Sequence, residues 1–238
     1  MPNEYFEFKQ FRIDQDRCSM KVCTDSCVFG AWMAGKIAGK SQQKILDIGT
    51  GTGLLSLMVA QRNSCLIHAI DIDNNSLLQA KENFQSAPWS HQMQAFCSDV
   101  KSWSSNPKYD CIISNPPFYE NDLLPTKKGK LDSRHSNSLS LPELIIATER
   151  LLTEHGFLGV LLPYSRAEYF EKEALKYSLF VNEKLYLRQS LKHNYFRAIF
   201  ILEKKQKPVV QDEISIRDHT NEYTAEFVFL LKDYYLYL

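Results

Sequence analysis

The sequence predicts an α/β protein built on a doubly wound, mostly parallel sheet with helices on both faces. Short apolar segments alternate with segments of helical pattern along the chain, and a glycine-rich turn links the first apolar segment to a helix. With 238 residues, 44% of them hydrophobic and 24% charged, the chain is long enough for one large domain. We expect a single domain over residues 1–238, with a core sheet over 44–205 and extensions at 1–40 and 206–238.

Each predicted element follows from its local pattern. Apolar, strand-like segments lie at 44–48, 66–71, 93–97, 110–114, 156–162, 183–188 and 197–203, and the tail holds a further strand-like stretch at 213–217. Helical patterns lie at 26–33, 54–61, 75–85, 142–153 and 166–177. Pro142 suits the first turn of its helix, where a missing N–H costs nothing. Residues 36–43 form a polar linker, and a polar loop is predicted over 119–139.

Composition excludes several classes of function. The formal net charge is zero, so any contact with nucleic acid must use a local basic patch. No apolar run reaches the roughly 18 residues that a membrane span needs, and the N-terminal residues do not read as a signal peptide. The six cysteines have no usual zinc spacing, which favours free thiols in a reducing cytoplasm. The six histidines are scattered, so we expect no metal.

The glycine turn after the first strand is the first candidate site. Asp47 precedes a G-x-G-x-G pattern made of Gly49, Thr50, Gly51 and Gly53. Glycines allow the backbone to turn tightly and to approach a ligand, although a plain strand-to-helix turn also tolerates one or two of them. Because the sequence lacks the third glycine of G-x-G-x-x-G, a dinucleotide is disfavoured. The pattern resembles motif I of class I S-adenosylmethionine methyltransferases, which implies a Rossmann-like, seven-stranded sheet and that cofactor.

Two further acids follow strands of the same sheet. Asp71 closes the second strand, where a carboxylate can accept hydrogen bonds from both ribose hydroxyls. Asp99 follows the third strand, where it can meet an adenine amino group. Either acid could instead cap a helix or lie in a solvated loop. Asp73 competes with Asp71, and we prefer Asp71 because it stands directly at the strand end.

The fourth strand ends in Ser-Asn-Pro-Pro-Phe, residues 114–118. Asn115, Pro116, Pro117 and Phe118 resemble the (N/D)PP(Y/F) motif of methyltransferases that act on planar amino or amide nitrogens. Such a nitrogen is a weak nucleophile, because its lone pair is delocalised. The side-chain oxygen of Asn115 and the carbonyl of Pro116 can each accept one amine hydrogen, and the prolines fix that geometry. Phe118 can stack on the base. A plain proline turn is the alternative.

Segments outside the sheet narrow the resemblance. Residues 17–32 resemble the segment before motif I in the tRNA adenine-N6 methyltransferases that modify position 37 of valine tRNA, and so do residues 86–89, 216–218, 222–226 and 234–238. That family implies tRNA as partner, Asn115, Pro116 and Phe118 at the target base, and Gly49, Gly51, Asp71 and Asp99 at the cofactor. It also implies Lys21, Thr24 and Asp25 over the methionine end. The family more often has tyrosine where this sequence has Phe118. Phenylalanine can still stack on the base but lacks the hydroxyl.

Two groups of basic residues are candidates for contact with RNA phosphates. One group lies in the predicted loop after residues 115–118: Lys127, Lys128, Lys130 and Arg134. The other flanks the last predicted hairpin: Arg188, Lys192, His193 and Arg197. Solvated loop charges are an equally good explanation for any single one of them. We expect a monomer that binds an unpaired anticodon-loop adenine, which needs no flipping from a duplex.

Other functions remain open on the sequence alone. Release-factor glutamine methyltransferases share the motif at 115–118 but carry a substantial N-terminal helical domain. An rRNA guanine-N2 methyltransferase is nearer in chemistry, and DNA adenine methyltransferases usually need a target-recognition domain. From another class, the chain could be a cofactor-binding RNA module without activity, although the intact Asn115 and prolines argue against it.

Overall fold

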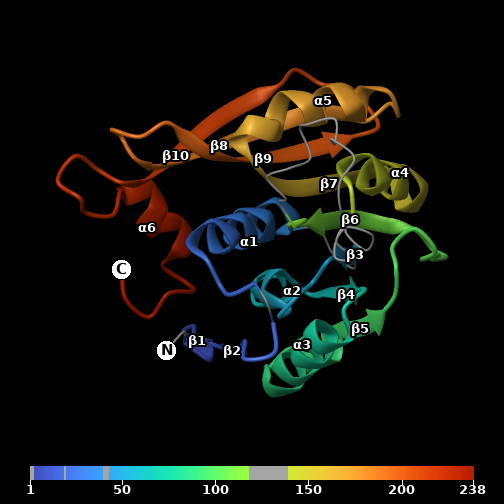
Figure 1. Ribbon diagram of the computed structural model, residues 1–238, viewed down its shortest axis with the longest axis horizontal. Coiled ribbons are helices and arrows are strands. Elements are labelled where there is room, and N and C mark those ends of the chain that lie inside the picture. Colours follow the sequence, from blue (N-terminus) through green and yellow to red (C-terminus); the bar gives the residue numbers. More distant parts are fainter. Residues whose placement is uncertain (1–2, 19, 40–42, 118–138) are drawn as a thin grey trace, which may run out of the picture.

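The computed structural model describes residues 3–18, 20–39, 43–117 and 139–238. Within these ranges one large sheet has the strand order β10-β8-β9-β7-β6-β3-β4-β5 (Figure 1). Its strands are β3 (Gln43–Ile48), β4 (Cys65–Asp71), β5 (Met93–Cys97), β6 (Tyr109–Ser114), β7 (Leu152–Pro163), β8 (Phe180–Ser190), β9 (Tyr195–Glu203) and β10 (Val210–Arg217). Only β9 runs antiparallel to its neighbours in this sheet. The predicted mostly parallel sheet is confirmed, and the tail segment adds β10 as an eighth strand beside β8.

Helices cover both faces of the sheet, as predicted. One hydrophobic cluster includes residues of α1 (Thr24–Ile37), α2 (Leu54–Ala60), α3 (Asn74–Ser86) and α6 (Ala225–Leu231), and the other those of α4 (Leu141–Leu151) and α5 (Ala167–Leu175). Neighbouring strand residues divide between the clusters: Ile45 and Cys111 join the first, Leu46 and Ile112 the second. Successive side chains of a strand point to opposite faces, so each buried strand contributes to both cores.

Helix α4 shows how local sequence sets an element's start and how tertiary pairing sets its end. Ser140 and Glu143 form a capping box, and Pro142 lies in the first turn as expected. The predicted end at residue 153 is wrong, because β7 already begins at Leu152, which pairs with Tyr109 of β6. Strand pairing with a distant segment therefore overrides the helical pattern there.

The terminal segments hold elements that the sequence pattern did not reveal. In the N-terminal segment, a hairpin of β1 (Tyr5–Glu7) and β2 (Arg12–Asp14) precedes α1. Two short 3₁₀ turns, η1 (Ser90–Gln92) and η2 (Tyr164–Arg166), were also not predicted, and they lie in the interior of the chain. Phe8 stacks on Phe11 with ring centroids 4.5 Å apart. Tyr234 is fully buried, and its hydroxyl donates to the carbonyl of Met58 in α2 at 3.0 Å. Both ends of the chain thus pack on the α1–α2 side of the sheet.

The part of the chain that the structure describes contains no helix with the length and apolar character of a membrane span.

Gly53 is expected to be more sensitive to substitution than Gly39, although both have a left-handed φ, of 84° and 80°. A Cβ at Gly53 would lie 2.4 Å from the Phe84 ring, whereas none of the described residues beyond its chain neighbours lies within 4 Å of one at Gly39. Gly53→Ala should therefore lower the free energy of unfolding by about 2–4 kcal/mol, and the matched control Gly39→Ala by about 1 kcal/mol. Urea denaturation of both variants measures this; equal losses would contradict the packing argument.

Candidate active site

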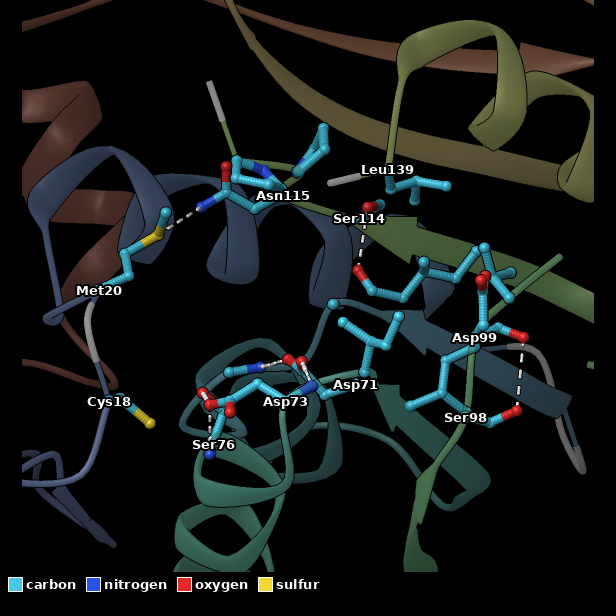
Figure 2. A pocket seen from close by; sticks show the side chains of 18 of the residues that line it. Cys18, Met20, Asp71, Asp73, Ser76, Ser98, Asp99, Ser114, Asn115 and Leu139 are labelled. Atoms are coloured by element: carbon cyan, nitrogen blue, oxygen red, sulfur yellow. Dashed lines mark hydrogen bonds between the residues drawn. The ribbon is translucent and has the colours of Figure 1, made fainter. Parts of the chain in front are cut away.

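The carboxyl ends of β3, β4, β5 and β6 enclose a cavity of about 320 Å³. Figure 2 shows its walls, which combine carboxylates from the ends of β4 and β5 with the turn after β6. The residues around it are Cys18, Met20, Ile48, Gly49, Gly51, Ile70, Asp71, Ile72, Asp73, Ser76, Ser98, Asp99, Val100, Lys101, Ser114, Asn115, Pro116, Pro117 and Leu139. Its position is the one at which open α/β sheets bind ligands, and its volume suits a small molecule.

The glycine turn forms one wall of this cavity. Gly49 and Gly51 line it with φ values of 71° and 55°, in the left-handed region that favours glycine. Apart from the chain neighbours, no atom of the described residues lies within 4 Å of a Cβ built at either position, which leaves open space beside the turn. The backbone N–H groups of Gly49 and Thr50 both donate to the Ile70 carbonyl, which fixes the turn against the end of β4.

Asp47 lies behind the turn and outside the residues that line the cavity. Its side chain is fully buried, and its Oδ2 accepts hydrogen bonds from Thr50 Oγ1 at 2.8 Å and Ser56 Oγ at 2.7 Å. Oδ1 has no hydrogen-bond partner among the described residues. Burial raises the pKa of this carboxyl to about 6, and the two hydroxyls oppose that shift only in part.

The carboxylates of Asp71 and Asp73 accept hydrogen bonds from different groups. Asp71 accepts from the backbone N–H of Gly51 and from that of Asp73, each at 2.9 Å, which joins the end of β4 to the glycine turn. Burial raises the pKa of Asp71. Asp73 caps α3, because its Oδ2 accepts from both Ser76 N and Ser76 Oγ, and these bonds lower its pKa. Asp73 thus has a structural role, and the preference for Asp71 as ribose ligand stays a prediction.

Asp99 lies on the cavity wall after β5. Its Oδ1 accepts from the Lys101 backbone N–H at 2.9 Å, and its Oδ2 is 3.4 Å from the Lys101 ammonium. Lys101 also pairs with Glu143 at the start of α4. These contacts orient an anionic carboxylate at the cavity edge, where it can accept from an amino group.

The turn after β6 brings Asn115, Pro116 and Pro117 to the cavity. Asn115 Nδ2 donates to Ser26 Oγ of α1 at 2.9 Å, and its Oδ1 is shielded from solvent without a hydrogen-bond partner among the described residues. Pro116 is buried and Pro117 exposed, and all three residues line the cavity. Phe118 lies outside the described residues. An orphaned acceptor at a cavity wall is costly unless a ligand donates to it.

Three residues assigned by resemblance to the methionine end are not among those lining the cavity. The Lys21 ammonium donates to the Gln15 carbonyl, and Thr24 is exposed in the first turn of α1. Asp25 is buried and pairs with Arg197 of β9, with 2.6 Å between Oδ2 and Nε. The structure thus gives Asp25 a role in anchoring α1 to the sheet, and the cofactor contacts of all three remain predictions.

The structure also brings residues to the cavity that the sequence reasoning did not select. Cys18 and Met20 reach it from the segment before α1, and Ser98 and Leu139 lie on the opposite wall (Figure 2). Val100 also lines the cavity. The signal for the first pair was their place inside residues 17–32, the most specific stretch of the resemblance. No local pattern in the sequence marked Ser98, Val100 or Leu139, and only the tertiary structure brings these residues to the cavity.

The candidate RNA-binding residues fall into two groups. Lys127, Lys128, Lys130 and Arg134 lie outside the described residues. Lys192 is exposed in the turn between β8 and β9, while Arg188 pairs with Glu213 of β10 and lies 5.6 Å from the Tyr195 ring centroid. The β8–β9 turn follows the carboxyl end of β8, on the same edge of the sheet as Asn115, because β8 runs in the direction of β6.

Comparison with known proteins identifies the family of this chain. The chain matches the family described as Methyltransferase small domain over residues 28–129. It is 41% identical over 241 residues to a tRNA1(Val) (adenine(37)-N6)-methyltransferase from Trichodesmium erythraeum, covering 99% of each chain. A protein of the same description from Dyadobacter fermentans is 39% identical over 239 residues, with 98% of each chain covered.

Solved structures show the same fold at low identity. A predicted O-methyltransferase from Agrobacterium tumefaciens has a TM-score of 0.65 at 12% identity, over 88% of this chain and 96% of that chain. A ribosomal protein L11 methylase from Lactobacillus delbrueckii has a TM-score of 0.57 at 17% identity, over 82% of this chain and 84% of that chain. Fold, site and family match together define a class I, S-adenosylmethionine-dependent methyltransferase. Within that class, the chain belongs to the family of tRNA1(Val) (adenine(37)-N6)-methyltransferases.

The cavity suits this cofactor on its own geometry. Gly49 and Gly51 leave a side open to a ligand, and the half-buried carboxylate of Asp71 lies beside them, where ribose hydroxyls can donate. Asp99 also lines the cavity, and its contact with an amino group of the base stays a prediction. Asn115 lies on the wall across the cavity from these carboxylates.

Asp71→Asn is expected to weaken cofactor binding by about 10- to 100-fold, since a hydrogen bond to a charged acceptor contributes roughly 1.5–3 kcal/mol. Asp73→Asn is the matched control: it removes a charge nearby but keeps a good helix cap, and should change the dissociation constant by less than about threefold. Isothermal titration calorimetry with S-adenosylhomocysteine measures both. If the two variants bind equally well, the ribose ligand lies elsewhere.

Asp47 is expected to make stability fall with rising pH. Its pKa is raised in the folded state from 3.8 to about 6, so the folded chain holds the proton more tightly than the unfolded chain. The contribution of this carboxyl to the free energy of unfolding is fully present below the pKa of the unfolded state. It falls by about 3 kcal/mol as the pH rises from there to about 6. Asp47→Asn should remove this decline. Urea unfolding of both proteins between about pH 4 and 7 tests it; identical pH profiles would show that Asp47 is not the group.

Proposed function

We propose that this protein transfers the methyl group of S-adenosylmethionine to the exocyclic N6 of adenine 37 in valine tRNA. The observation that carries the proposal is the turn at Asn115 and Pro116, which lines the cavity and holds an amide oxygen that is shielded from solvent and has no hydrogen-bond partner among the described residues. The names of the full-length relatives support the substrate, since each describes this reaction on this tRNA.

The acceptors at the turn suit a planar amine. Asn115 Oδ1 accepts one hydrogen of the N6 amine and the Pro116 carbonyl accepts the other. Two accepted hydrogens favour a tetrahedral nitrogen, whose lone pair is then free of the ring and points into the cavity. The prolines hold the carbonyl in place, so little ordering remains when the base enters. Neither acceptor needs to be a strong base, which is why an amide suffices here.

The cofactor, when bound, supplies an electrophilic methyl group on a sulfonium centre. Asp71 is proposed to hold its ribose and Asp99 its adenine amino group, while Gly49 and Gly51 let the backbone approach. The transferred group carries its own activation, so the proposal involves no metal; the described residues contain no group of three or more His, Cys, Asp or Glu side chains able to hold one.

The RNA contacts are proposed for basic side chains at the carboxyl edge of the sheet. Lys192 is exposed at the β8–β9 turn, and Arg188 lies at the end of β8 beside an aromatic group. Each exposed cation that meets a phosphate should add about one unit to the salt dependence of binding. We also propose that the protein acts in the cytoplasm as a monomer, with the whole chain as one domain; the packing of both terminal segments on α1 and α2 supports the last point.

Asn115→Ala is expected to abolish methylation, lowering the rate by at least about 100-fold, because the amine loses one of its two acceptors. Cofactor binding should stay unchanged. Nucleoside mass spectrometry on a valine tRNA transcript incubated with purified protein and S-adenosylmethionine measures the product, with an adenine-to-guanine transcript at position 37 as control. Methylation of the control transcript, or on rRNA or protein instead, would contradict the proposed substrate, and full activity of the variant would contradict the mechanism.

A further inference from the structure

Asn115 reaches the cavity through an amide whose two ends have opposite character. For the proposed reaction the oxygen must face the substrate amine, because an amide N–H there would meet another donor. A rotation of the amide by half a turn would exchange the two ends at no cost in shape. Something in the structure must therefore select one orientation.

The neighbours of Nδ2 provide this selection. Ser26 Oγ, on the first turn of α1, accepts from Asn115 Nδ2 at 2.9 Å, and Ser26 is only 4% exposed. Met20 Sδ lies 4.0 Å from the same nitrogen (Figure 2). A hydroxyl can accept or donate and so tolerates either orientation, but a thioether can only accept. Met20 therefore favours nitrogen on this side, while Ser26 supplies the stronger bond.

Two further contacts hold Ser26 in place, one to its hydroxyl and one to its backbone N–H. Cys23 Sγ lies 3.0 Å from Ser26 Oγ, so the hydroxyl hydrogen has a place to point that is away from Asn115. The Ser26 backbone N–H donates to Asp25 Oδ1, and the other oxygen of Asp25 is paired with Arg197 of β9. The start of α1 is thus tied to the sheet, and Ser26 is presented to the turn after β6 at a fixed place.

We propose that Ser26 is a positioning residue for methyl transfer: together with Met20 it locks the Asn115 amide with its oxygen toward the target amine. This inference rests on the proposed role of Asn115 and adds to it a residue from α1, outside the motif at the turn. It also explains why Oδ1 has no partner among the described residues: the neighbouring hydrogen-bonding groups satisfy the nitrogen and leave the oxygen for substrate.

Single-turnover methylation of valine tRNA tests the proposal with paired variants. Ser26→Ala should slow the methylation step by about tenfold, as expected for the loss of one hydrogen bond in the reacting arrangement. The dissociation constants for S-adenosylhomocysteine and tRNA should stay within about twofold, because Ser26 is buried and is not among the residues that line the cavity. Ser26→Thr, which keeps the hydroxyl, should recover most of the rate. Ser86→Ala is the matched control, since Ser86 also lies in a helix and donates to the Glu82 carbonyl at 3.0 Å.

Two further variants separate orientation from general damage. Met20→Leu keeps the apolar volume at a half-exposed position and removes the acceptor, so it should lower the rate by about two- to threefold without unfolding the protein. In an Asn115→Asp background both ends of the group are oxygens, so no orientation needs selecting. There, Ser26→Ala should change the rate by less than about twofold. A full tenfold loss in that background, or a Ser26→Ala enzyme as fast as the wild type, overturns the proposal.

A measurement that does not depend on methylation can test the Ser26–Asn115 hydrogen bond separately from the proposed function. In ¹⁵N-labelled protein, the Asn115 side-chain amide signals should move, and their exchange with solvent should quicken, when Ser26 becomes alanine. Unmoved signals would overturn the proposed hydrogen bond whatever the enzyme methylates. Moved signals in a protein that leaves valine tRNA unmethylated would keep the Ser26–Asn115 contact and overturn the substrate assignment instead.

Discussion

The alignment of three parallel strand ends is the constraint on which the site depends. Ile48 at the end of β3 pairs with Ile70 of β4 on one side and with Ser114 of β6 on the other. The Ser114 hydroxyl donates to the Ile48 carbonyl at 2.9 Å, which fixes the last residue of β6 against β3. Because parallel strands end at one edge, the glycine turn, the acid after β4 and the turn at Asn115 meet there without further ordering.

Polar groups at this edge keep hydrogen-bonding capacity that the protein itself leaves unused. Asn115 Oδ1 is shielded from solvent with no partner among the described residues, and the partly buried Asp71 carboxylate accepts from two backbone N–H groups. Such groups lower the stability of the folded chain, since they lose water and gain little. A ligand that donates hydrogen bonds recovers this loss. The site therefore has binding energy available for a nucleoside and an amine.

The segment before the sheet completes the cavity as well as the core. Cys18 and Met20 reach the cavity, Ser26 holds the Asn115 amide, and Asp25 ties α1 to Arg197 of β9. Aromatic residues of the hairpin β1–β2 pack with the C-terminal segment on the same side of the sheet. A segment that precedes the first core strand in sequence thus forms part of the wall around the reacting groups.

The sequence by itself determined the elements and the chemistry that local pattern records. Buried strands, glycines at positive φ and the residues 115–117 at a strand end were all readable, because each depends on a short run of neighbours. The tertiary structure alone decided which groups meet. Helix α4 ends at Leu151, because Leu152 pairs with Tyr109 of β6. The Asp47 carboxylate is directed away from the cavity, and that of Asp73 caps a helix. Ser26 of α1 lies in hydrogen-bond contact with Asn115. Contacts between residues far apart in sequence depend on sheet register and helix packing, which no local window contains.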